Sequence, residues 1–226
     1  MSKIAILTDS SCDIPQEMAE KYGIDIMSFH ILLDDVDYVE RVDCTNTEFY
    51  DKMRAAKGVP STAAITPIQF CKKYCQYVDE GYTDVIHVPI NKSGSSTYNN
   101  ALMAQGMLRE ERPEHHLNIH LLDPHTYSMV FGWYLCEMAR KLQNGAEIRH
   151  VIHEFEQQMN CTPQAFTQTA ASYPQKKNSP RTRVKNPPSR SRRVPSFLFS
   201  RVRAAFAVRS AASGRTSPNT ATCPRT

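Results

Sequence analysis

Three short segments rich in serine and threonine carry the side chains of this sequence that are best suited to chemistry. They are Thr8–Ser11, Ser61–Thr66 and Ser93–Thr97. Hydroxyl groups donate hydrogen bonds, and the free N–H groups at a helix start add partial positive charge, so such segments can receive an anion. Two such segments at neighbouring strand ends are predicted to bind one carboxylate together. Each segment on its own is also explained by an ordinary turn or helix cap.

Familiar catalytic and nucleotide-binding signatures are absent from the sequence. It contains no Gly-Lys-Thr loop for phosphate, no GxGxxG for a dinucleotide and no GxSxG for a serine hydrolase. A small serine-dependent hydrolase or transferase that uses Ser10 or Ser95 remains an alternative, and it would need a base within about 3 Å of the hydroxyl. We expect no catalytic residue.

The histidines do not form a metal-binding pattern. His115 and His116 are adjacent, and His150 and His153 are three residues apart, whereas a zinc site needs three or four converging ligands. We therefore expect surface or internally satisfied histidines and no metal or cofactor.

Two cysteines, Cys71 and Cys75, are one helical turn apart, which is not the spacing of a CxxC redox pair. Packing in the core is the expected role of both.

Strand and helix patterns alternate along the first 160 residues and predict an α/β fold with a parallel sheet flanked by helices. In such sheets, ligands gather beyond the carboxyl ends of the strands, where we expect all three hydroxyl-rich segments to lie. An acidic turn at Asp34 and Asp35 and an apolar stripe of Ala101, Leu102, Gln105 and Leu108 are also expected. The expected strands are 4–7, 24–33, 38–42, 84–89 and 117–122, and the expected helices are 15–22, 45–56, one from 67, 98–112, 128–144 and 146–159.

The charges divide the 226-residue chain into two unlike parts. All 23 acidic residues lie in residues 1–156, and 13 of the 27 Lys and Arg lie in residues 157–226. A one-sign block rich in Pro, Ser and Arg cannot bury enough apolar surface to offset its conformational entropy. The sequence thus predicts a folded unit over 1–160 and a disordered basic tail over 161–226.

The cysteines and the hydropathy favour a cytoplasmic protein. Seven scattered cysteines do not form a disulfide framework, and no apolar stretch reaches the roughly 20 residues of a membrane span.

Taken in order, five segments resemble the amino-terminal half of the DegV family of bacterial fatty-acid-binding proteins. The resemblance covers about residues 3–159. The matching segments are Thr8–Pro15, Asp43–Tyr50, Pro60–Pro67, Ser93–Ala101 and Asp123–Trp133.

The resemblance implies a carrier that binds one long-chain fatty acid and has no catalytic residues of its own. It places the carboxylate on Thr62 and Ser95, with Ser96, Thr97 and Ser10 as further candidates. It also implies a separate fatty acid kinase as the partner that phosphorylates the carboxyl group. This chain has Ala63 where many members have serine, and Ser96 where many have glycine.

The second half of the family's pattern is missing after Met159. A shift of reading frame near Asn160 would produce such an abrupt loss of acidic residues, and we take it as a hypothesis. The alternative is a genuine basic tail that binds nucleic acid through its charge. An acyl slot lacking its second wall would leave an exposed apolar patch, so we also expect impaired carriage.

Overall fold

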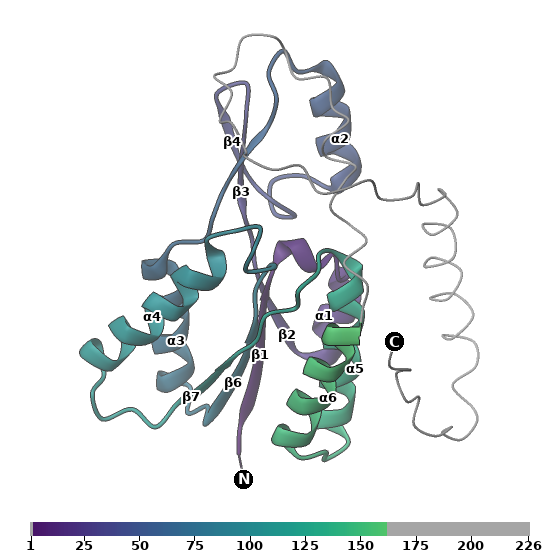
Figure 1. The fold of residues 1–226 in the computed structure, drawn as a ribbon. Coiled ribbons are helices and arrows are strands. Elements are labelled where there is room, and N and C mark those ends of the chain that lie inside the picture. The colour runs from purple at the N-terminus through teal and green to yellow at the C-terminus, as the bar shows by residue number, and fades with distance from the viewer. Residues whose placement is uncertain (1, 162–226) are drawn as a thin grey trace, which may run out of the picture. The chain divides into compact units, whose positions relative to one another are not determined.

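The structure is a computed structural model that describes residues 2–161. Four parallel strands form its central sheet in the order β2-β1-β6-β7 (Figure 1). The two inner strands are buried along almost their whole length, as expected for parallel strands covered on both faces. The predicted α/β class is therefore confirmed, whereas the predicted disordered tail lies outside the described residues. The strands are β1 (Ile4–Asp9), β2 (Ile24–Met27), β6 (Asp84–Val88) and β7 (Asn118–Leu121).

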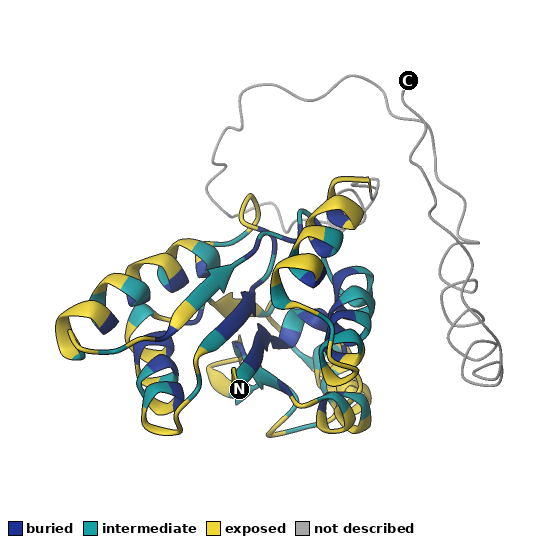
Figure 2. Ribbon diagram, turned by 90° about the horizontal axis from the view of Figure 1, so that it is seen from below, coloured by how far each residue is buried: buried dark blue, intermediate teal, exposed yellow. Residues whose placement is uncertain are grey.

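Helices cover both faces of this sheet. Side chains alternate along a strand, so Ala5 and Leu7 of β1 face one helical layer while Ile4 and Ile6 face the other. Buried residues accordingly gather on the central strands and on the helix faces turned toward them (Figure 2). The first layer consists of α3 (Pro67–Asp79) and α4 (Thr97–Glu111), and the second of α1 (Gln16–Tyr22), α5 (Met129–Gln143) and α6 (Ile148–Cys161).

A second, antiparallel sheet has the order β4-β3-β5. It consists of β3 (His30–Leu33), β4 (Val36–Val39) and β5 (Ser61–Ala63), and α2 (Asn46–Ala55) lies beside it through an edge-to-face contact of Tyr38 with Phe49. The expected acidic turn is present. Asp34 and Asp35 lie between the paired residues Leu33 and Val36, and both have positive φ values, 48° and 66°, as hairpin turns require.

Three sequence predictions in this region were wrong. The single strand expected over 24–33 is two strands in different sheets, because the N–H of Phe29 donates to the Ser10 hydroxyl (3.0 Å) and its side chain is buried. The segment 61–63, expected to be a loop, is a strand formed by pairing with β3, although all three of its residues are exposed. Strand β4 begins at Val36, two residues earlier than expected.

Helix boundaries follow local capping chemistry. Thr45 with Glu48, and Thr66 with Gln69, form capping boxes at the starts of α2 and α3. Asp13, although it lies two residues before the Pro15 cap position, does not cap α1; its carboxylate accepts a hydrogen bond from Ser128.

The expected apolar stripe of α4 is partly wrong. Ala101 and Leu108 are buried as expected, but Leu102 is 55% exposed and Ala104 is buried. The spacing of Ala101, Ala104 and Leu108 is that of one helical face, and it lets small side chains bring the helix close to the sheet.

A buried carboxylate joins the carboxyl ends of β1 and β6. Asp9 is 0% exposed and accepts hydrogen bonds from the N–H of Ile90 (2.7 Å), the N–H of Ser11 (3.1 Å) and the Ser11 hydroxyl (2.5 Å). Beside it, the Thr8 hydroxyl donates to the carbonyl of Val88 (2.7 Å). Burial raises the pKa of Asp9 to about 6, in spite of the three donors.

One glycine sets how closely α5 approaches the loop after β1. A Cβ atom on Gly132 would lie 2.2 Å from the carbonyl oxygen of Cys12 and 3.0 Å from the side chain of Ile14. Because the nearest atom belongs to the backbone, a side chain here forces the helix away from the loop.

Two glycine substitutions test this packing. Gly132→Ala is expected to lower the free energy of unfolding by about 1–3 kcal/mol or more. Gly106→Ala in α4, where a Cβ atom meets nothing within 4 Å, is the matched control and should raise it by about 0.5–1 kcal/mol. Urea unfolding of both variants gives the comparison, and equal effects would contradict the close approach.

The raised pKa of Asp9 predicts a pH dependence of stability. The folded state holds the proton more tightly than the unfolded state does, so this group favours folding increasingly as the pH falls from 7 toward 4. A shift from 3.8 to about 6 corresponds to about 3 kcal/mol. As the pH falls from 7 toward 4, the difference between the free energy of unfolding of the parent and that of Asp9→Asn should increase by up to about 3 kcal/mol. A difference that stays constant with pH would contradict the assignment.

Candidate functional site

The segment after β6 is folded back on itself by a buried asparagine. The Asn91 side-chain oxygen accepts hydrogen bonds from the N–H and the hydroxyl of Ser93, both at 2.9 Å, and its carbonyl accepts from the N–H of Gly94 (3.0 Å). Asn91 is 5% exposed. This turn fixes the direction in which the chain enters α4.

Two hydroxyls meet at the start of α4. The Ser95 and Thr97 hydroxyl oxygens are 2.8 Å apart, and the Ser95 oxygen also accepts from the N–H of Thr97 (3.2 Å). Ser95 is half-buried and Thr97 is buried. Ser96 occupies the cap position and is exposed, but its side chain makes no capping hydrogen bond. Free N–H groups in the first turn of a helix can accept an anion.

Thr62 lies on a strand of the second sheet and is exposed. It pairs directly with Ile31 of β3, so the two side chains are on the same face of that sheet. The amide of Asn100 in α4 donates to the carbonyl of Ile65 (2.8 Å), which joins the segment after β5 to the helix that follows Ser95. Thr62 and Ser95 therefore belong to two segments that the structure holds together.

Ser10 has two hydrogen-bond partners in the interior. Its hydroxyl donates to the Glu40 carboxylate, and its oxygen accepts from the N–H of Phe29 (3.0 Å). It is 0% exposed. These hydrogen bonds fit a role of Ser10 in connecting the two sheets. They test neither the predicted role of Ser10 in ligand binding nor its alternative role as a nucleophile.

A small cavity of about 140 Å³, lined by both apolar and polar side chains, lies between the second sheet and α2. On its edge, one Arg41 nitrogen donates to the carbonyl of Ile14 (2.5 Å), and the other terminal nitrogen, Nη1, is buried without a hydrogen-bond partner in the described part of the chain. Ligand sites commonly have volumes of about 300–1,000 Å³, so this cavity can hold only part of a ligand. Its lining residues are Asp13, Ile31, Tyr38, Glu40, Arg41, Cys44, Asn46, Phe49, Tyr50 and Met53.

The segment after β7 also contacts the start of α4. A Cβ atom on Gly94 would lie 2.0 Å from the Tyr127 hydroxyl oxygen, so the phenol occupies the space beside this glycine. In the sequence, Gly94 is simply one residue of the hydroxyl-rich segment Ser93–Thr97, and nothing there relates it to Tyr127, which is 33 residues away.

Several residues that shape the site were missed in the sequence. Asp9, Asn91 and Asn100 orient the hydroxyl-rich segments through the contacts given above. The spacing of Asn91 and Ser93 is a recognisable turn signal. Nothing in the sequence pairs Asn100 with Ile65, because that contact depends on how α4 packs.

Outside this edge of the sheet, the described residues contain one convergence of three metal-ligating side chains. Cys71, Cys75 and Glu111 place one sulfur or oxygen atom each within 4.8 Å of one another. Cys71 is buried in the core, as expected for both cysteines, but Cys75 is only half-buried. In residues 2–161, no helix is both long and apolar enough to cross a bilayer.

Comparisons with known proteins agree on one family. A family model described as "Uncharacterised protein, DegV family" matches residues 3–173. A DegV domain-containing protein of Clostridium perfringens is 30% identical over 160 residues, which cover 71% of this chain and 55% of that protein. One from Staphylococcus aureus is 28% identical over 153 residues, with coverages of 67% and 51%. The chain thus spans about half the length of these curated relatives.

Solved structures show the same relationship. A Thermotoga maritima protein described as revealing a fatty acid binding function is 27% identical with a TM-score of 0.61, covering 71% of this chain and 56% of that chain. A DegV lipid binding protein from the same organism is 28% identical with a TM-score of 0.61, and the coverages are 70% and 54%. The Bacillus subtilis DegV structure, 22% identical with a TM-score of 0.64 and coverages of 71% and 55%, shares the fold. With a family model that matches most of its length, this chain belongs to the DegV family.

Proposed function

We propose that this chain binds a long-chain fatty acid and that the hydroxyls of Thr62 and Ser95 hold its carboxylate. The observation that carries the proposal is the hydrogen bond from Asn100, in the first turn of the helix that follows Ser95, to the carbonyl of Ile65, in the segment that contains Thr62. Two segments fixed against each other can present donors to one small headgroup.

The chemistry of the α4 start supports an anionic headgroup. The Ser95 and Thr97 hydroxyls share one hydrogen bond, so the hydroxyl that accepts this bond keeps its own hydrogen free to donate to a ligand. Hydrogen bonds to a charged carboxylate are worth about 1.5–3 kcal/mol each, more than those between neutral groups. First-turn N–H groups left without a Ser96 cap add to the attraction.

The acyl chain would need apolar surface, of which this chain supplies a part. Thr62 is on the sheet face that carries Ile31, and Ile31, Phe49 and Met53 are the apolar part of the lining of the cavity beside α2. Because that cavity measures only about 140 Å³, the described residues offer a partial slot. We therefore still expect this chain to be impaired as a fatty acid carrier.

Names of similar proteins support the ligand class. The two Thermotoga maritima structures, both more than 25% identical to this chain, are described as binding fatty acid or lipid. We extend this to the present chain as a carrier that presents acyl groups to a separate fatty acid kinase and has no catalysis of its own. A Streptococcus pneumoniae Fatty Acid Kinase B3 protein loaded with linoleic acid shares the fold at 18% identity.

The double variant Thr62→Val, Ser95→Ala tests the headgroup assignment. Loss of two hydroxyl donors should weaken fatty acid binding by at least about 100-fold, as expected for about 3 kcal/mol or more. Mass spectrometry of lipid extracted from the purified protein should find fatty acid with the parent and none with the variant. Titration with a fluorescent fatty acid gives the affinity.

Ser61→Ala is the matched control, because Ser61 precedes Thr62 on the same exposed strand and points to the opposite face. It should retain the bound lipid. Equal lipid content in the parent and the double variant would refute the headgroup assignment, and lipid-free parent protein that also fails to take up the probe would refute fatty acid binding.

A further inference from the structure

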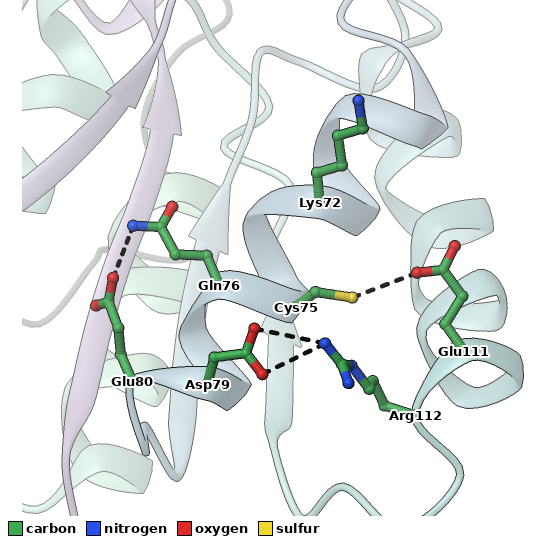
Figure 3. Close-up of a pocket in the computed structure, with 7 residues that line it drawn as sticks. All are labelled: Lys72, Cys75, Gln76, Asp79, Glu80, Glu111 and Arg112. Carbon is green, nitrogen blue, oxygen red and sulfur yellow. Dashed lines mark hydrogen bonds and ion pairs between the residues drawn. The ribbon is translucent and has the colours of Figure 1, made fainter.

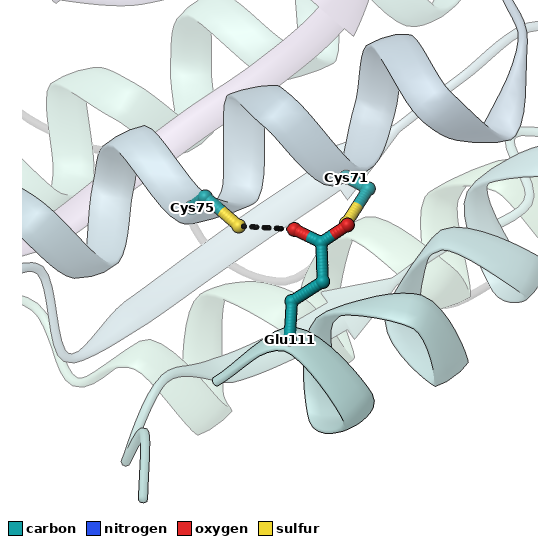
Figure 4. Close-up of side chains that lie close together, drawn as sticks. All are labelled: Cys71, Cys75 and Glu111. Atoms are coloured by element: carbon teal, nitrogen blue, oxygen red, sulfur yellow. Dashed lines mark hydrogen bonds between the residues drawn. The ribbon is translucent and has the colours of Figure 1, made fainter. Parts of the chain in front are cut away.

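The packed helices α3 and α4 bring three metal-ligating side chains together. Cys71 and Cys75 are four residues apart on α3, so both point from one face of that helix. Glu111 is the last residue of α4, and its carboxylate faces the two sulfur atoms (Figure 4). It is fourteen positions after Thr97, which is about 20 Å along the helix axis.

We infer that Cys71, Cys75 and Glu111 together bind one thiophilic divalent cation of the zinc type. Ligands four residues apart on a helix are a known way to hold zinc, as in the His-Glu-x-x-His pattern. Thiolate and carboxylate are both accepted zinc ligands. This inference does not depend on the proposed fatty acid site.

The distances fit a tetrahedral ion. The Cys75 sulfur lies 3.5 Å from a Glu111 carboxylate oxygen, and all three ligand atoms lie within 4.8 Å of one another. With metal–sulfur and metal–oxygen bonds of about 2.3 and 2.0 Å, a tetrahedral ion separates a sulfur ligand from an oxygen ligand by about 3.5 Å. Only small side-chain rotations are needed, and Glu111 is exposed and free to make them.

The charge balance also suits a cation. A divalent ion with two thiolates and one carboxylate leaves one net negative charge. Arg112 directly follows Glu111, and its positive charge can offset it.

Solvent can reach the site. A surface cleft of about 640 Å³ runs along α3 and the end of α4, with Cys75, Glu111 and Arg112 among its lining residues (Figure 3). Three protein ligands leave a fourth position, which water from this cleft would fill. The bound ion would join the two helices that cover one face of the sheet.

Cobalt binding tests the inference, because Co²⁺ in a tetrahedral thiolate site absorbs strongly in visible light. The full chain, reduced and freed of metal, should bind one equivalent of Co²⁺ with this spectrum, and Zn²⁺ should displace it. Cys75→Ser and Glu111→Gln change side chains that are not in the core, and each should weaken Zn²⁺ binding by more than about 100-fold. A competing chromophoric chelator measures this affinity.

Cys44→Ser is the matched control, since Cys44 is a half-buried cysteine beside α2. It should leave the cobalt spectrum and the zinc affinity unchanged. Zn²⁺ should also raise the Tm of the parent and of Cys44→Ser, but not that of Cys75→Ser. Failure of the parent to bind, or unchanged binding by both Cys75→Ser and Glu111→Gln, would overturn the inference. If Cys75→Ser loses the circular dichroism signal of its helices, the metal binding of Glu111→Gln alone decides whether the inference holds.

Discussion

The buried carboxylate of Asp9 is the interaction on which the arrangement of this protein's loops depends. A charged group without water is unfavourable unless donors surround it, and Asp9 obtains its donors from its own loop and from the loop after β6. Two chain segments that are 81 residues apart thereby acquire a fixed spacing. Ser10 and Asn91 follow directly on either side, so the second sheet and the start of α4 are both oriented from this point.

The layer formed by α3 and α4 carries two chemically different groups of side chains. Where the helices begin, threonine and serine hydroxyls with helix N–H groups suit an anion. Along the body of α3 and at the end of α4, two thiols and a carboxylate suit a cation. The first group lies at the helix starts because every helix of a parallel sheet runs back against its strand and places its amino end beside the carboxyl end of the sheet.

Much of this architecture was predictable from the sequence because its causes are local. The apolar runs 4–7 and 84–89, the Thr45 cap, the acidic turn at Asp34 and Asp35, and the order of elements all follow from neighbouring residues. The split of 24–33 into two strands did not, since it depends on a hydrogen bond between Ser10 and Phe29. Strand β5 likewise exists only through its partner β3, and the convergence of Glu111 with Cys71 and Cys75 needs two packed helices. Long-range contacts leave no periodic signal in one sequence.

The contact between Gly94 and the Tyr127 hydroxyl has an evolutionary consequence. A larger residue at 94 is compatible with the fold only when the phenol at 127 is shortened or withdrawn, so substitutions at the two positions cannot be independent. Among related chains, the pair should therefore vary in concert: glycine should accompany tyrosine, and bulk gained on one side should be matched by bulk lost on the other.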